Sequence, residues 1–155
     1  MAKDSVLRVQ EILHSKGDEL TGVEYIYDER LENGKTRQFR VYIKKSQFEE
    51  ISISVKNFSV KFEDFIDITR PLLLENPHPN DIHKAFRLLD TDQSDTIDIN
   101  ELAVFMPLIV PNSNAYMLLR HFEKVDSNKD YRLNLEEFTQ FIKRNLVRDL
   151  VLGRL

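Results

Sequence analysis

The chain has 155 residues, of which 41% are hydrophobic, and its formal net charge is −4 at pH 7. This length and apolar content are sufficient for one compact domain or two small lobes with a real core. The mild negative charge argues against a nucleic-acid-binding protein, and the absence of cysteine excludes a disulfide framework and a thiolate metal site.

Membrane and secretion signals are also missing from the sequence. No apolar run reaches the length of a transmembrane helix, and the first residues contain no signal-peptide core. We therefore expect a cytoplasmic protein without a transmembrane segment.

The first predicted element is a helix near the N-terminus. The apolar residues that indicate it have helical spacing, and they are Val6, Val9, Ile12 and Leu13. Such a helix would be capped by Asp4 or Ser5 and would end at Gly17.

The next segment indicates a β-hairpin. Residues 23–27 and 39–43 are rich in β-forming side chains, and Asn33-Gly34 lies between them. Asn-Gly between two such runs is the strongest short-range hairpin signal, so we expect two antiparallel strands here.

Between this hairpin and the second half, the sequence predicts a short helix and then a break. Ser46 and Glu49 have the spacing of a capping box, which would open the helix. Pro77 and Pro79 interrupt helices on both sides, and Asn80 would cap the helix that follows. This divides the chain into an N-terminal lobe, a linker and a C-terminal part, at residues 1–76, 77–80 and 81–155.

Two twelve-residue stretches in the second half carry matching chemistry. They run from Asp90 to Glu101 and from Asp126 to Glu137. Each has oxygen-bearing side chains at positions 1, 3 and 5, an apolar residue at position 8 and a glutamate at position 12, which is the spacing of oxygen ligands around calcium. The candidate ligands are Asp90, Asp92, Ser94, the Thr96 carbonyl, Asp98 and Glu101 in the first stretch, and Asp126, Asn128, Asp130, the Arg132 carbonyl, Asn134 and Glu137 in the second.

The residues that flank both stretches have the periodicity of helices with one buried face. Apolar residues precede each stretch at positions −8, −5, −4 and −1, with His121 as the one exception, and others follow each glutamate at helical spacing. Ile97 and Leu133, at position 8, would pair as a short two-stranded link. The flanking residues are Ile82, Ala85, Phe86, Leu89, Leu102, Phe105, Met106 and Ile109 for the first stretch, and Leu118, His121, Phe122, Val125, Phe138, Phe141 and Ile142 for the second.

Residues 80–146, with these two loops and their flanks, resemble an EF-hand pair of the calmodulin-like superfamily of calcium-binding proteins. The resemblance implies a mainly α-helical fold with Ca²⁺ as the cofactor in both loops, and helices that open on calcium binding in sensor members. It also gives residues 53–64 an interpretation as a degenerate loop with almost no ligands, since Val60 and Asp64 fall at positions 8 and 12. The N-terminal half is therefore expected to be either a degenerate EF-hand-like lobe or a mixed α/β-hairpin lobe.

Position 6 of both loops departs from the family pattern, which has glycine there because the turn favours positive φ. Asp95 in the first loop tolerates the left-handed region, whereas Tyr131 in the second loop costs about 1–2 kcal/mol. The first loop also has four acidic ligand candidates and the second has three. We therefore expect the first loop to bind calcium at least as tightly as the second.

The sequence leads us to expect a calcium-dependent regulatory or sensor protein rather than an enzyme. It would change shape on binding calcium ions and offer an apolar surface to a protein or peptide target. The alternatives are a calcium buffer that opens little and a metal-independent EF-hand scaffold. The apolar surface would be lined by Phe86, Leu102, Phe105, Met106, Phe122, Phe138 and Phe141.

Residues 141–155 mix apolar and basic side chains and would continue the last helix beyond the EF-hand pair. This extension has two interpretations. It packs on the first half of the chain, or it docks on a partner, a membrane surface or the protein's own groove.

Overall fold

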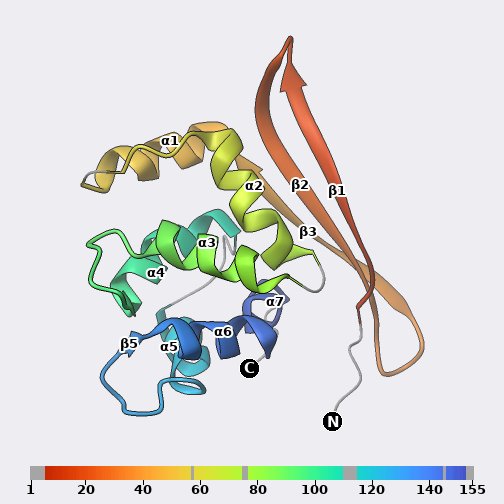
Figure 1. Ribbon diagram of the computed structural model, residues 1–155. Helices are drawn as coiled ribbons and strands as arrows, with labels where there is room; N and C mark the ends of the chain where they lie inside the picture. The colour runs from red at the N-terminus through yellow and green to blue at the C-terminus, as the bar shows by residue number, and fades with distance from the viewer. Residues whose placement is uncertain (1–5, 57, 75–76, 110–114, 145, 153–155) are drawn as a thin grey trace.

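The computed structural model describes residues 6–56, 58–74, 77–109, 115–144 and 146–152. A three-stranded antiparallel sheet lies along one side of the molecule, and the helices gather on one face of it (Figure 1). The described part of the first half is mixed α/β, and the second half is helical apart from two short strands. Buried apolar side chains from both halves form one continuous core.

The sheet consists of β1 (Val6–Lys16), β2 (Glu19–Arg30) and β3 (Thr36–Lys44), and β2 is the central strand. The pairing of β2 with β3 confirms the predicted hairpin. In its turn Gly34 has a φ of +83°, and the side chain of Asn33 accepts a hydrogen bond from the Lys35 amide at 2.9 Å. The hairpin of β1 and β2 extends well beyond the helices (Figure 1).

The predicted N-terminal helix is wrong, because residues 6–16 form β1 and pair with β2. Residues of β1 pair with β2 along the strand, for example Leu13 with Val23. The hydrogen bonds of this pairing hold the segment in an extended conformation. Val and Ile favour strands, and the helix preference of the Leu, Arg, Gln and Glu residues in this run is a weak tendency that pairing with a neighbouring strand overrides. Gly17, expected to end the helix, instead turns the chain into β2 with a φ of +63°. The two predicted caps, Asp4 and Ser5, lie outside the described residues.

A helix–loop–helix follows the sheet, formed by α1 (Lys45–Ser54) and α2 (Phe62–Leu73). The short helix predicted near residue 46 is confirmed, but its capping box is wrong: α1 begins at Lys45, and the N-cap residue Lys44 makes no side-chain capping bond. α2 begins at position 10 of the degenerate loop proposed for residues 53–64. The first half thus combines both interpretations, a hairpin and then a helix–loop–helix.

The second half contains two more helix–loop–helix units whose exit helices also begin at loop position 10. Their helices are α3 (Pro79–Leu89), α4 (Ile99–Ile109), α5 (Ala115–Glu123) and α6 (Leu135–Lys143). The prediction that Asn80 caps α3 is wrong. α3 begins one residue earlier, at Pro79, and the Asp81 carboxylate accepts a hydrogen bond from the His78 amide at 2.9 Å.

The last helix does not continue as predicted, because α6 ends at Lys143 and a separate short helix, α7 (Leu146–Val151), follows it. Leu146, Val147 and Leu150 of α7 are buried, and α7 packs against α5, α6 and α2. The tail therefore packs on the rest of the chain, including the first half. Within the described residues, no helix combines the length and apolar character needed to cross a bilayer.

Candidate metal centre

Each of the two predicted loops connects the helices that its flanks indicate. α3 ends at Leu89, directly before Asp90, and α4 begins within the first loop at Ile99. The apolar positions before and after both loops are buried wherever the structure describes them, as is His121. The helices bury these faces against each other. This packing fixes the directions in which the helices enter and leave each loop.

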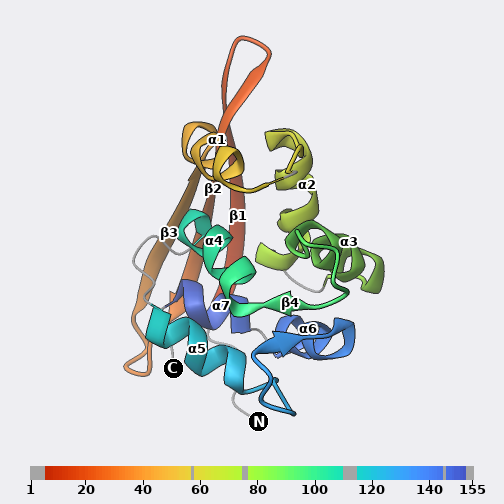
Figure 2. The same ribbon diagram turned by 90° about the vertical axis from the view of Figure 1, so that its left-hand side faces the viewer.

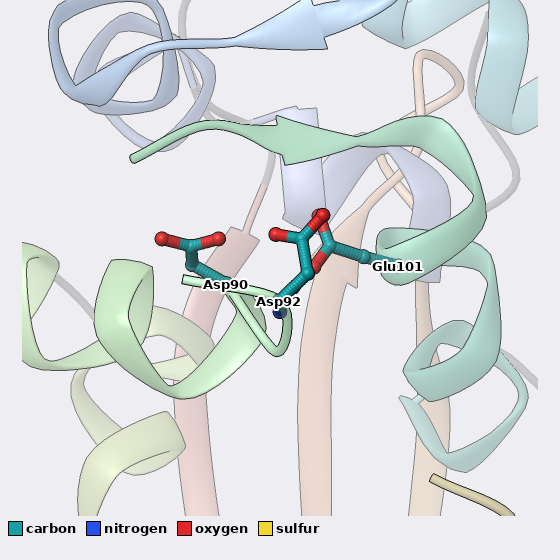
Figure 3. Close-up of side chains that lie close together, drawn as sticks. All are labelled: Asp90, Asp92 and Glu101. Carbon is teal, nitrogen blue, oxygen red and sulfur yellow. Dashed lines mark hydrogen bonds between the residues drawn. The ribbon is translucent and has the colours of Figure 1, made fainter. Parts of the chain in front are cut away.

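Loop 1 (residues 90–101) brings three carboxylates together. Ligand atoms of Asp90, Asp92 and Glu101 all lie within 4.8 Å of one another. Figure 3 shows that they come from three places, the end of α3, the loop itself and the start of α4. Like charges at such distances repel by roughly 1–4 kcal/mol per pair. A divalent cation at this point would remove that repulsion.

Glu101 joins the two ends of loop 1. Its Oε2 accepts hydrogen bonds from the hydroxyl of Thr91 at 3.0 Å and the amide of Asp92 at 3.2 Å. Its Oε1 accepts one from the Asp98 amide at 3.0 Å, and the Glu101 amide donates to Oδ1 of Asp98 at 2.7 Å. Asp98 therefore serves as the cap of α4, while Glu101 faces the start of the loop.

Ser94 and the Thr96 carbonyl lie beside the same carboxylates. The Ser94 amide donates to Oδ1 of both Asp90 and Asp92 at 3.1 Å, and its hydroxyl donates to the Thr96 carbonyl at 3.0 Å. Hydrogen bonding from the Ser94 side chain holds the pKa of Asp92 below its ordinary value. Asp95 has the positive φ expected at position 6, +64°, and its amide donates to Oδ2 of Asp90 at 2.9 Å.

Loop 2 (residues 126–137) repeats this plan. The Tyr131 amide donates to Oδ2 of Asp126 at 2.9 Å, and Tyr131 has a φ of +60°. Glu137 accepts bonds from the amide and hydroxyl of Ser127, both at 3.0 Å, and from the Asn134 amide at 3.1 Å. The Glu137 amide in turn donates to Oδ1 of Asn134 at 2.8 Å. The position-12 glutamate thus closes both loops in the same way.

One buried oxygen in loop 2 has no partner. Asp126 is buried, and its Oδ1 is the one buried side-chain nitrogen or oxygen among the described residues that makes no hydrogen bond. Burial raises the pKa of Asp126, whereas the amide of Arg132 lowers the pKa of Asp130. An unpaired buried acceptor is costly. A cation at Asp126 would satisfy it, so the donor set of loop 2 also fits a metal ion.

The two loops differ in how tightly they gather charge. Loop 1 is the one place in the described chain where three side chains drawn from His, Cys, Asp and Glu have ligand atoms within 4.8 Å of one another. In loop 2 Asp126 interacts with Asp130, but Glu137 does not complete such a group. The third oxygen position there belongs to Asn128, which carries no charge. The expectation that loop 1 binds calcium at least as tightly as loop 2 stays a prediction.

A short two-stranded link joins the loops, as predicted. Ile97 of β4 (Ile97–Asp98) pairs with Leu133 of β5 (Arg132–Leu133), and both side chains are fully buried. The link includes one contact that was not predicted from the sequence. The Arg132 guanidinium crosses from loop 2 and donates to the Thr96 hydroxyl of loop 1 at 3.1 Å.

The hydroxyls at position 2 were not predicted as part of either network. Thr91 and Ser127 both donate to the position-12 glutamate of their own loop. Their shared position was a usable signal, because a hydroxyl occurs at position 2 of both loops. The reach of Arg132 across to Thr96 had no such signal, since it depends on the pairing of β4 with β5.

Paired helix–loop–helix units with oxygen-lined loops, linked by a short two-stranded ladder, define an EF-hand pair. Comparison with known proteins agrees, since a family description of the EF-hand domain pair matches residues 79–143. Calhepatin of Lepidosiren paradoxus is 32% identical over 63 residues, which cover 41% of this chain and 84% of that protein. The chain belongs to the EF-hand family of calcium-binding proteins.

Two further relatives match over longer segments. Human centrin-3 is 32% identical over 79 residues, covering 51% of this chain and 47% of centrin-3. Calcium-binding protein CML19 of Arabidopsis thaliana is 25% identical over 115 residues, covering 72% of this chain and 69% of that protein. The chain thus spans about half the length of centrin-3, and likewise about half of a calmodulin-like relative from rice.

Proposed function

We propose that the protein binds one calcium ion in each loop and acts as a calcium-dependent regulatory protein. The observation that carries this proposal is the shared plan of the two loops, with three clustered carboxylates in loop 1 and the unpaired buried Oδ1 of Asp126 in loop 2. The proposed ligands are Asp90, Asp92, Ser94, Thr96, Asp98 and Glu101 in loop 1, and Asp126, Asn128, Asp130, Arg132, Asn134 and Glu137 in loop 2, with Thr96 and Arg132 acting through their carbonyls.

Calcium is the cation that this donor set favours. All the proposed ligand atoms are oxygens, and they include neutral hydroxyl, amide and carbonyl groups as well as carboxylates. Calcium accepts six to eight oxygens in flexible geometry, whereas magnesium demands a near-ideal octahedron and usually keeps several waters. Bound calcium would supply positive charge, and the chain's own residues would hold the loop ends together around it.

Within this function the protein would be a sensor whose apolar partner surface is covered by its own chain. The seven residues expected to line an apolar partner surface are all buried, the most exposed being Phe86 at 7%. A protein or peptide target could reach them only after a rearrangement. The same burial favours the alternative of a calcium buffer, because buffer EF-hands barely open on binding. A dye that fluoresces on exposed apolar surface distinguishes the two, since only a sensor would give a calcium-dependent signal.

A calcium titration followed by amide NMR tests the binding itself. We expect the amides of Asp95 and Tyr131 to shift at micromolar calcium, because each donates to the first aspartate of its loop. Glu101→Gln should weaken binding in loop 1 by roughly tenfold or more, and Glu137→Gln should do the same in loop 2, since ligand charge tunes affinity. A parallel titration with magnesium is the control. No response of either amide below millimolar calcium would leave only the metal-independent scaffold.

Three further expectations, on location, catalysis and domain division, belong to the same proposal. We propose a cytoplasmic location, a binding role without catalysis, and a division of the sequence at residues 77–80 into a lobe without intact EF-hand loops and an EF-hand pair. The absence of a membrane-spanning helix among the described residues is compatible with the first. Cell fractionation with a tagged full-length chain would test it.

A further inference from the structure

The apolar cleft of the EF-hand pair is closed by a helix from the first half of the chain. We define the cleft by the residues of α3, α4 and α6 that line it, which are Ala85, Leu88, Leu89, Leu102, Phe105, Met106, Phe138, Phe141 and Ile142. Phe65, Thr69, Leu72 and Leu73 of α2 face these residues, together with Val147 of α7. In Figure 1 α2 lies between the sheet and α3, and Figure 2 shows α2 and α3 next to each other, one above the other.

α2 fits this cleft as a bound amphipathic helix would. Its four lining residues fall at i, i+4, i+7 and i+8, which is one face of a helix and the spacing of helix-in-groove recognition. Phe65 is fully buried, and its ring stacks on that of Phe105 with centroids 6.0 Å apart. The space left over is a cavity of about 30 Å³. Sites for drug-sized ligands hold roughly 300–1,000 Å³, so α2 leaves no room for a second occupant.

The other side of α2 is fastened to the sheet. The Tyr27 hydroxyl donates to the Leu73 carbonyl at 2.9 Å in a buried hydrogen bond. Arg70 donates from Nε to Oε2 of Glu11 on β1 at 2.6 Å, and the Tyr25 hydroxyl donates to the same oxygen at 2.8 Å. Burial raises the pKa of Tyr25, so its hydroxyl remains a donor. β1 and β2 thus hold the last turns of α2 while the cleft takes its apolar face.

Loop 1 has a direct route to this contact through α4. Glu101, which closes loop 1, lies on α4, and α4 also packs against β3 and α1. Phe105, one turn further along, touches both Phe58 and Phe65, with ring centroids 5.3 and 6.0 Å away. Val55, directly after α1, lines the same shallow pocket as Glu101 and Phe105. A shift of α4 therefore changes the surface on which α2 rests.

We propose that α2 is the intramolecular ligand of the EF-hand cleft, and that calcium binding in loop 1 loosens it by moving α4. This inference rests on the proposed function, because the free energy of calcium binding would drive the movement of α4. We call the hydrogen bonds that join α2 to the sheet the clamp. In this proposal the clamp holds α2 in the cleft when calcium is absent. An outside amphipathic helix reaches the cleft only when α2 has left it.

Hydrogen exchange of the full-length chain, with and without calcium, tests the proposal. We expect the amides of α2 from Phe65 to Leu73 to exchange about tenfold or more faster when calcium is bound, while the amides of loops 1 and 2 become more protected. Unchanged or slower exchange in α2, together with protected loops, would overturn this inference and leave the proposed function standing. If the loops themselves fail to respond, the proposed function fails first.

Variants that weaken the clamp provide a second test without calcium. Tyr27→Phe with Arg70→Gln removes two of the bonds that fasten α2 to the sheet, and we expect about a tenfold gain in α2 exchange and in dye binding. The matched control is Tyr42→Phe with Arg40→Gln, the same two changes on β3, where Arg40 pairs with the exposed network of Glu24 rather than with α2. Equal effects of the two double variants would contradict the clamp. A folded control and a folded clamp variant, checked by circular dichroism, are required for this comparison.

Discussion

Tyr131 occupies position 6 of loop 2 with a φ of +60° although the residue is 52% exposed. A non-glycine residue in the left-handed region costs about 1–2 kcal/mol. The exposed ring contributes little packing in return. We therefore expect Tyr131→Gly to raise the free energy of unfolding by about 1 kcal/mol, measured by urea denaturation in the presence of a chelator.

The same variant shows where the strain acts. The loop adopts positive φ at this position while Asp126 accepts the Tyr131 amide, so the cost belongs to the folded loop. We expect Tyr131→Asn, which tolerates the left-handed region, to recover part of the gain. Calcium affinity rising tenfold with unchanged stability would contradict this account, because it would place the strain in the binding step alone.

Arg132 connects the hydrogen-bond networks of the two loops. Its amide donates to Oδ1 of Asp130 at 3.0 Å in loop 2, and its guanidinium donates to the Thr96 hydroxyl in loop 1. The Thr96 hydroxyl also lies 3.0 Å from the hydroxyl of Ser94. This chain of contacts ties the fifth position of one loop to the fifth position of the other.

We expect Thr96→Val to reduce the cooperativity of calcium binding by about 0.5–1 kcal/mol, because it removes the acceptor for Arg132 and preserves the shape and charge. Isothermal calorimetry with calcium provides the measurement. Arg132→Gln serves as the comparison. It should also reduce cooperativity but raise the average affinity, since it removes a positive charge near both sites. Unchanged cooperativity in both variants would show that the β4–β5 ladder alone couples the loops.

At the scale of elements, α7 packs against α2, α5 and α6 and covers the core beside α2. Leu150 is 1% exposed, and Val147 reaches the cavity between α2 and the cleft. We expect Leu150→Ala to lower the free energy of unfolding by about 2–5 kcal/mol, as a buried cavity does. Leu13→Ala on β1 is the matched control. Its side chain is 55% exposed, and its removal should cost no more than about 0.5 kcal/mol.

The elements that could be predicted from the sequence are those with a local cause. The two loops, their buried flanks and the pairing of Ile97 with Leu133 follow from a ligand spacing and a helical period that lie within a few residues. Asn33-Gly34 specified its hairpin turn in the same way. The assignment of twelve individual residues as metal ligands stays a prediction, although the structure brings Asp90, Asp92 and Glu101 together.

The elements that were missed have distant causes. β1 is a strand because it pairs with β2, and its own apolar spacing suited a helix. The predicted caps at Ser46 and Asn80 were wrong, because each helix begins one residue before the predicted cap. The position of α2 depends on the cleft, which exists only after the EF-hand pair has formed. No local pattern in residues 62–73 specifies which surface their apolar face will cover.

At the scale of the whole molecule, the division at residues 77–80 separates two types of sequence but not two cores. Side chains of the sheet, α2 and the EF-hand pair belong to one buried cluster. We therefore expect a single cooperative unfolding transition, with fluorescence and circular dichroism giving coincident curves. Two separated transitions would show that the lobes are independent.

If calcium loosens α2 as proposed, the carboxylate of Glu11, which helps to hold α2, affects calcium binding in the loops. Coupling between two sites is reciprocal, so a helix that calcium loosens must itself oppose calcium binding by the same free energy. Glu11 lies on β1 and accepts hydrogen bonds from Arg70 and Tyr25, and neither of these two bonds reaches a loop. Glu11→Gln should nevertheless raise calcium affinity. On this view the sheet, which offers no ligand of its own, sets the calcium concentration at which the protein responds.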